Sequence, residues 1–269
     1  MIRQPAVAGY FYPAEPTELS RELESLLRQP AAAEKLRARG CVVPHAGYRY
    51  SGRVAGAVYA RLELPKRYII LCPRHYPQGA VLAVSPASEW LTPLGSVPVD
   101  AELAAELKHE CPSLREDAVA HSEEHALEVQ LPFLQRLAGD FRFVPIAIGP
   151  VRFDALEELG RAIARVVSKH EEPILVVASS DMNHYESDAV TRVKDRKAIE
   201  RILALDARGL YDTVHREEIS MCGVGAATAM LTAANQMGAT RAVEIQYATS
   251  ADASGDKKRV VGYAGIAVQ

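Results

Sequence analysis

Short runs of β-branched and other apolar residues alternate along this chain with longer amphipathic stretches. In the longer stretches apolar residues recur at intervals of three and four, which is the spacing of one face of an α-helix. Strands that alternate with helices predict a sheet with helices on both faces, in a single α/β domain over residues 1–269. The predicted strands are 39–44, 68–72, 141–148, 174–178, 243–247 and 260–268, and the predicted helices are 17–28, 51–62, 100–110, 124–138, 153–169, 190–205 and 223–237.

The composition narrows the class of protein. A chain of 269 residues with 48% hydrophobic residues can bury a sizeable core. Its formal net charge of -3 gives no basic face, so we expect no nucleic-acid partner. No apolar stretch approaches the roughly 20 residues that cross a bilayer, and the first residues lack the apolar core of a signal peptide. We therefore expect a cytoplasmic protein without a membrane partner.

The four cysteines show no close-paired spacing, which favours free thiols or a metal thiolate over disulfides.

Two histidines follow predicted strands almost directly. His45 comes after the run 39–44, and His75 follows the run 68–72 and Pro73. Ligand sites of open α/β sheets gather beyond the carboxyl ends of the strands, so both histidines are expected at one edge of the sheet. The alternative for each is a loop histidine that is hydrogen-bonded to the backbone.

Cys222 precedes the helix predicted over 223–237. A thiol at a helix N-terminus is expected to have a lowered pKa, which favours the thiolate. The alternative is a buried cysteine that packs as a small apolar residue. Two neutral imidazoles and one thiolate can hold Fe(II), Zn(II) or Cu and leave a coordination position open. His45, His75 and Cys222 are therefore the candidate metal ligands.

A cluster of polar residues follows the predicted strand 174–178. It contains Ser179, Ser180, Asp181 and His184. Polar side chains at a strand end are costly unless they form hydrogen bonds, so they either cap the next element or face a site. We predict that Asp181 orients an imidazole and that His184 acts as a general acid or base.

His121 and His125 are four residues apart, and two histidines at this spacing on one face of a helix can bind zinc. The metalloprotease pattern needs Glu directly after its first histidine, and here that residue is Ser122. We therefore reject a protease. His125 is kept as a candidate general acid or base, with Glu128 as its possible partner.

Several motifs taken together resemble the Memo family, whose prokaryotic members are the B component of the AmmeMemoRadiSam set. Each motif is short and weak alone, but their order along the chain is specific, and they span nearly all of it. The matching segments are 8–13, 44–48, 73–75, Glu124–His125 with Glu128, 179–181 with His184, Cys222–Gly223 and 263–265.

The resemblance implies a fold like that of class III extradiol dioxygenases, a three-layer α/β/α domain with a central mixed sheet between helices. It implies a metal held by His45, His75 and Cys222, with the other candidates in the same cleft: His125, Asp181 and His184. Animal members have been associated with iron, copper, redox chemistry and phosphotyrosine peptides. The sequence departs from them at Tyr76, where they have a second His, and at 224–225, where they have Arg-His.

Three hypotheses about function follow. The first is an Fe(II)-dependent oxidoreductase, related to the dioxygenases, that acts on a small molecule or peptide. The second is a non-enzymatic binding or scaffold protein that acts with a peptide or a radical-SAM partner. The third is a Zn-dependent hydrolase or lyase in which His125 or His184 is the base. Zn and Cu thus remain alternatives to Fe(II) as the bound metal.

Overall fold

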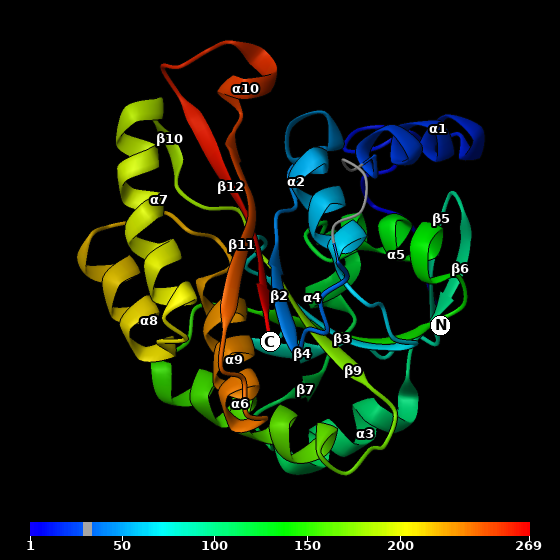
Figure 1. Ribbon diagram of the computed structural model, residues 1–269. Coiled ribbons are helices and arrows are strands. Elements are labelled where there is room, and N and C mark those ends of the chain that lie inside the picture. Colours follow the sequence, from blue (N-terminus) through cyan, green and yellow to red (C-terminus); the bar gives the residue numbers. More distant parts are fainter. Residues whose placement is uncertain (29–33) are drawn as a thin grey trace.

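The computed structural model describes residues 1–28 and 34–269, and a mixed sheet forms its centre (Figure 1). Four parallel strands make up the middle of this sheet, and their side chains are almost all buried because helices cover both faces. Antiparallel strands join on either side. The sheet order is β10 (His184–Glu186), β12 (Val260–Val268), β2 (Gly40–Val43), β9 (Ile174–Ser179), β3 (Arg67–Pro73), β8 (Arg142–Ile148), β4 (Leu82–Val84) and β7 (Arg115–Glu116), and β11 (Ala242–Thr249) pairs with β12.

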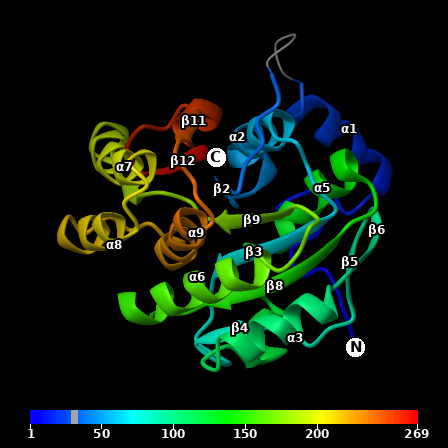
Figure 2. The ribbon, with the colours of Figure 1, turned by 60° about the horizontal axis from the view of Figure 1, so that its bottom comes forward.

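Helices form a layer on each face of the sheet (Figure 2). Alternate residues of a strand point to opposite layers, so Cys41 packs on one side and Val42 on the other. One layer contains α1 (Pro16–Leu26), α2 (Tyr48–Arg61), α4 (Val119–Ser122) and α5 (Leu131–Ala138). The other contains α3 (Ala101–Glu110), α6 (Phe153–Val167), α7 (Asp188–Leu203), α8 (Ala207–Arg216) and α9 (Val224–Gln236). The predicted three-layer fold is thereby confirmed.

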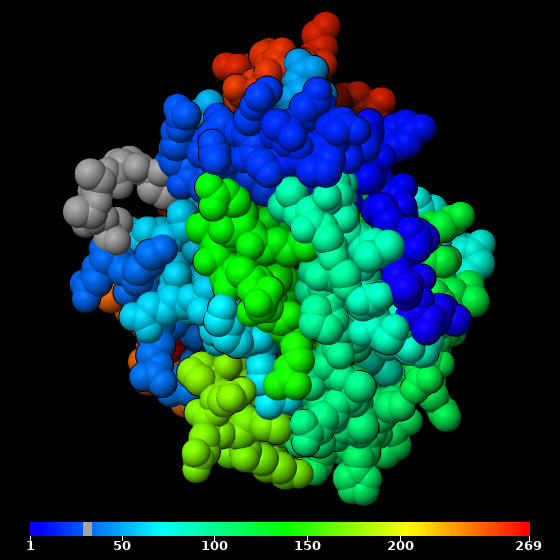
Figure 3. All heavy atoms as spheres, turned by 90° about the vertical axis from the view of Figure 1, so that its right-hand side faces the viewer, coloured from blue at the N-terminus to red at the C-terminus, as the bar shows by residue number. Residues whose placement is uncertain are grey.

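A small second sheet involves the start of the chain. Strand β1 (Ile2–Arg3) pairs in parallel with β5 (Glu89–Thr92), which forms a hairpin with β6 (Gly95–Pro98). In Figure 3 the N-terminal segment, in dark blue, lies along residues drawn in cyan and green.

No helix of the described ranges combines the length and the apolar content that crossing a membrane requires.

All six predicted strands are present, but the structure also contains short strands that were not predicted, namely β1, β4, β5, β6, β7 and β10, and the helix predictions are incomplete as well. Helix α8 was not predicted, and α2 begins three residues before the expected start at residue 51. The expected helix 124–138 is wrong in its first part, because residues 123–127 are not helical and a short 3-10 turn, η1 (Glu128–Gln130), precedes α5. A short helix, α10 (Ala251–Ser254), also follows β11.

Asp195 on α7 is a buried carboxyl group with an unusual titration. Burial raises its pKa to about 7, although Arg192 and Arg196 favour the ionised form. Its oxygens accept hydrogen bonds from the backbone N–H of Asn183 at 2.8 Å and from the hydroxyl of Tyr247 at 2.7 Å. The folded protein therefore keeps a proton here that the unfolded chain releases near pH 4.

Because of the raised pKa of Asp195, we expect the folded state to become less stable as the pH rises from about 4 to about 7. In that interval the folded state binds more protons than the unfolded chain, so the free energy of unfolding falls by on the order of 1 kcal/mol per pH unit. Asp195→Asn should remove most of this dependence. Urea unfolding at pH 5 and pH 8 measures it, and an equal pH response of variant and wild type would contradict the assignment.

Candidate metal site

His45 lies just beyond the end of β2, beside the end of β9. Its Nδ1 lies 2.9 Å from Oγ of Ser179. The Ser179 hydroxyl donates its single proton to the carbonyl oxygen of Ala126 at 2.5 Å, so Nδ1 of His45 is the donor to Ser179. Nε2 of His45 consequently carries a lone pair, which is the form in which an imidazole binds a metal.

His75 follows β3 and is held by Glu124. The Nδ1–H of His75 donates to Oε1 of Glu124 at 2.9 Å, and its backbone N–H donates to Oε2 at 2.6 Å. Burial opposes ionisation of Glu124, but the hydrogen bonds from His75 and the backbone lower the pKa of this carboxyl group to about 2. An ionised carboxylate that fixes an imidazole in this way is the usual support of a metal-ligating histidine. The Nε2 of His75 has no hydrogen-bond partner among the described residues.

His125 completes a cluster of three imidazoles. His45, His75 and His125 can each offer one ring nitrogen such that the three atoms lie within 4.8 Å of one another. The rings of His75 and His125 are stacked with centroids 4.6 Å apart, and Glu124 Oε1 is 3.5 Å from Nδ1 of His125. Burial and the neighbouring imidazoles lower the pKa of His45 well below its usual value and that of His125 to about 4. Both rings are therefore neutral at pH 7.

Cys222 lies beside this cluster, two residues before α9. Its Sγ is 3.2 Å from Nε2 of His45 and accepts a hydrogen bond from the backbone N–H of Asp181 at 3.3 Å. The expected lowering of its pKa is wrong, because burial and then the nearby Asp181 carboxylate raise the pKa of the thiol well above its usual value. A metal cation at the site would instead lower the pKa of this thiol, because a thiol that coordinates a metal is deprotonated.

Asp181 and His184 lie at the same edge of the sheet, and the contact of Asp181 differs from the expected hydrogen bond to an imidazole. Oδ1 of Asp181 accepts the backbone N–H of His45 at 2.8 Å, so the carboxylate holds the His45 loop rather than an imidazole ring. The Nδ1 of His184 faces the carbonyl oxygen of Ser220 at 2.9 Å, and its backbone N–H donates to the Ser220 hydroxyl. His184 thus fixes the segment that leads to Cys222, while its Nε2 has no hydrogen-bond partner in the described part of the chain.

Two other residues of the sequence analysis lie outside the cluster. His121 is buried, and its Nε2 faces the carbonyl oxygen of Ala83 at 3.1 Å. Glu128 does not support His125, because its carboxylate pairs with Arg3 and accepts the Tyr12 hydroxyl. The residue that sequence reasoning missed is Glu124, the carboxylate next to His125 in the chain. Its sequence signal was its place in the family-like Glu124–His125 segment.

The donors fit a transition-metal ion. Two ligands on one tetrahedral ion lie roughly 3.5 Å apart when the bonds are near 2.0 Å to nitrogen and 2.3 Å to sulfur. The separation of 3.2 Å between Cys222 Sγ and His45 Nε2 is close to that value. Imidazole nitrogens and a thiol match zinc, copper and iron rather than calcium or magnesium.

The chain is thus an α/β/α protein with a histidine cluster at the carboxyl edge of its parallel strands. A family model described as Memo-like protein matches residues 3–267. A MEMO1 family protein of Methanopyrus kandleri is 43% identical over 278 residues, covering 99% of this chain and 98% of its own length. One of Methanosarcina barkeri is 44% identical over 269 residues, covering 100% of both. The chain therefore belongs to the Memo family.

A solved structure shows a likeness of fold. An uncharacterized protein of Escherichia coli K12 matches with a TM-score of 0.53 and 13% sequence identity. The match covers 86% of this chain and 100% of that chain. At this identity the likeness concerns the arrangement of the sheet and helices alone.

Proposed function

We propose that this protein is a metal-dependent oxidoreductase whose metal is held by His45, His75 and Cys222. The observation that carries the proposal is the orientation of the donors. Ser179 and Glu124 occupy the Nδ1 atoms of His45 and His75, which leaves the Nε2 atom of each ring for a metal, and Nε2 of His45 lies 3.2 Å from Sγ of Cys222. His125 is the neighbouring imidazole, which can act on substrate or join the ligands.

Fe(II) is the metal that we propose, with Zn or Cu as the alternatives. Bound iron would supply one-electron and O2 chemistry, as it does in non-haem oxygenases. The remaining residues have definite tasks in this proposal. His184 takes or gives a proton at its free Nε2, and Asp181 keeps the His45 loop in place through the backbone N–H. The proposed substrate is a small molecule or a peptide.

Purification without oxygen, followed by metal analysis by mass spectrometry, tests the proposal. We expect close to one iron per chain and O2 consumption that depends on this iron when candidate reductants and substrates are added. Stoichiometric zinc without O2 consumption would favour hydrolysis instead. A folded protein that takes up no metal after anaerobic reconstitution would refute the metal site and favour a binding protein with a peptide or radical-SAM partner.

A further inference from the structure

A cavity of about 710 Å³ lies between helices α2, α7 and α10 and strand β11. Helices α2 and α10 contact each other, and both lie in the upper half of Figure 1. The volume is in the range of small-molecule sites. His45, His75 and Cys222 do not line this cavity, so it is distinct from the candidate metal site.

The charged side chains around this cavity are mostly basic. Arg49 and Arg53 of α2 and Arg192 of α7 line it, and its one acidic side chain among the described residues is Asp252. Arg192 is already neutralised, because it pairs with Asp188 at 2.9 Å and lies 3.5 Å from Asp252. The positive charge left over is that of Arg49 and Arg53.

Arg49 and Arg53 have no ion pair in residues 1–28 and 34–269, where a pair means a nitrogen within 4.0 Å of a carboxylate oxygen. Arg49 also borders a neighbouring cavity lined by Glu15, Glu18 and Glu22, but none of these carboxylates comes within that distance of it. Two positive charges therefore face the cavity without a direct counterion.

The positions of these two arginines are unfavourable for the helix that carries them. Arg49 is the second residue of α2, whose first turn contains no acidic residue, and a helix N-terminus carries partial positive charge. Arg53 follows one turn later on the same face, and like charges at this spacing repel each other. Local rules of this kind are broken most often at functional sites, so the two arginines favour a site for an anion.

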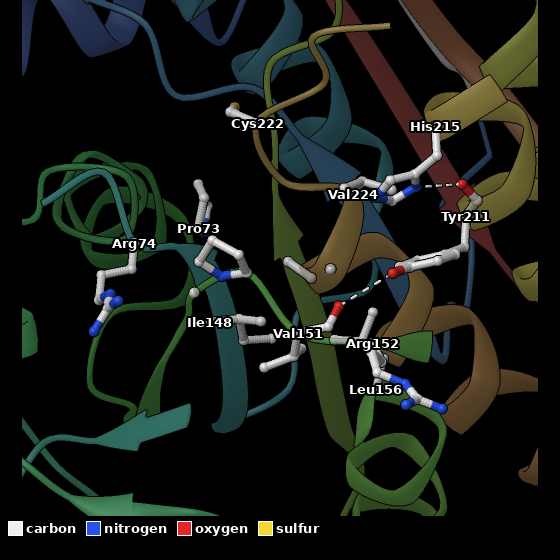
Figure 4. Close-up of a pocket in the computed structure, with 14 residues that line it drawn as sticks. Pro73, Arg74, Ile148, Val151, Arg152, Leu156, Tyr211, His215, Cys222 and Val224 are labelled. Carbon is white, nitrogen blue, oxygen red and sulfur yellow. Dashed lines mark hydrogen bonds between the residues drawn. The ribbon is translucent and has the colours of Figure 1, made fainter. Parts of the chain in front are cut away.

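The cavity beside Cys222, of about 470 Å³, lacks such a pair of arginines (Figure 4). The guanidinium of Arg74 points away from that cavity, and its Nη1 donates to backbone carbonyl oxygens of the loop 78–80. Arg152 is exposed and pairs with Asp154 at 3.2 Å. An anion is thus favoured beside α2 and not beside Cys222.

The rest of the wall beside α2 suits an organic group. It is formed by small apolar side chains and by two tyrosine rings, namely Val54, Ala248, Ala253, Tyr50 and Tyr247. The guanidinium of Arg49 lies 5.7 Å from the ring centroid of Tyr50, so a ligand that binds Arg49 can also contact this ring.

From these features we infer that the cavity binds a small phosphate monoester. Such a group carries about −1.5 to −2 charges at pH 7, which matches the two arginines without an ion pair. A guanidinium binds phosphate through two parallel hydrogen bonds, and Arg49 and Arg53 are neighbours on one helix face. The organic part of the ester lies on the apolar and aromatic wall. The inference goes beyond the proposed function and does not depend on it, because no candidate metal ligand takes part.

Isothermal titration calorimetry of the full chain with ribose 5-phosphate tests the inference. A neutral chelator, phenanthroline, is present so that the phosphate cannot bind to a metal, since an anionic chelator would compete for the arginines. Ribose is the neutral analogue, and succinate is a dicarboxylate of similar charge. We expect ribose 5-phosphate to bind at least tenfold more tightly than succinate, and ribose not to bind.

Four variants locate the binding site. Replacing both arginines, Arg49→Gln with Arg53→Gln, should weaken binding of ribose 5-phosphate at least tenfold. This protein should be at least as stable to heat as the wild type, because the repulsion between the two arginines is gone. Ala253→Glu should weaken binding as strongly by placing a carboxylate in the wall, whereas Ala253→Gln should change it less than twofold. Arg161→Gln, which removes an exposed arginine of α6 that pairs with Glu157, should have no effect.

Each other outcome would overturn the inference. Ribose that binds as well as its phosphate, no binding of any probe, or binding unchanged in both the double variant and Ala253→Glu would show that α2 holds no phosphate. A preference for succinate would assign a dicarboxylate to the cavity instead. Binding that occurs only without the chelator would place the phosphate on a metal. Because the main measurement excludes metal, failure of the metal proposal leaves its result unaffected.

Discussion

His45→Ala is expected to abolish metal binding, with an affinity loss well above 100-fold. His45 is almost fully buried, its ring belongs to the imidazole cluster, and its Nε2 lies 3.2 Å from Sγ of Cys222. Mutation of a residue that merely supports a ligand typically costs roughly 10–100-fold in metal affinity, so loss of a ligand should cost more. Metal content after anaerobic reconstitution, together with a competitive chelator titration, measures the effect.

The matched control is His109→Ala, which removes an exposed histidine at the end of α3 and should leave the metal content unchanged. Cys222→Ser and His125→Ala then separate the two possible third ligands. We expect Cys222→Ser to lose iron and His125→Ala to keep most of it. Near-stoichiometric iron in His45→Ala protein would rule out this cluster as the metal site.

The position of the candidate site could be predicted because it follows from the chain direction of parallel strands. The apolar runs 39–44 and 68–72 identify two buried strands, and a histidine follows each of them. Parallel strands present their carboxyl ends at one edge. His45 and His75 were therefore expected to lie close together if their strands were close in the sheet. In the structure only β9 lies between these two strands.

The support of the site could not be predicted in the same way. Glu124 and His75 are 49 residues apart, and their contact depends on how the segment 123–127 packs against the sheet edge. Periodicity predicted a helix there. Instead, Oε1 of Glu124 accepts the backbone N–H of Ala126 at 2.8 Å, and such local side-chain bonds compete with helical hydrogen bonds. The same carboxylate thus interrupts the helix and holds the imidazole.

The pKa of Cys222 shows a similar limit. Its place before a helix was visible in the sequence, and a helix N-terminus favours a thiolate. The burial of the sulfur and the closeness of Asp181, which comes from a different strand end, were not visible. Desolvation acts on the whole charge of a thiolate, so it outweighs the partial charge at a helix end.

Glu128→Gln is expected to lower the free energy of unfolding by about 3 kcal/mol or more. The Glu128 side chain is fully buried, forms an ion pair with buried Arg3, and accepts hydrogen bonds from the Tyr12 hydroxyl at 2.5 Å and the backbone N–H of Ala6 at 2.7 Å. Glutamine has nearly the same shape but no charge, so Arg3 would remain buried without its counterion. Breaking a buried ion pair by removing one partner typically costs about 3–5 kcal/mol. Urea unfolding at pH 7 measures the loss.

The control for this change is Glu24→Gln, which breaks an exposed pair with Arg136 and should cost less than about 1 kcal/mol. Adding Arg3→Met to Glu128→Gln should recover part of the loss, because it removes the uncompensated charge. A loss for Glu128→Gln as small as that of the control would show that the pair is not needed for stability.

The Glu128→Gln change should also affect the candidate metal site. The segment that Glu128 holds carries Phe11, and the ring centroids of Phe11 and His125 are 4.7 Å apart. Glu128→Gln should therefore weaken metal binding moderately, whereas Glu24→Gln should not.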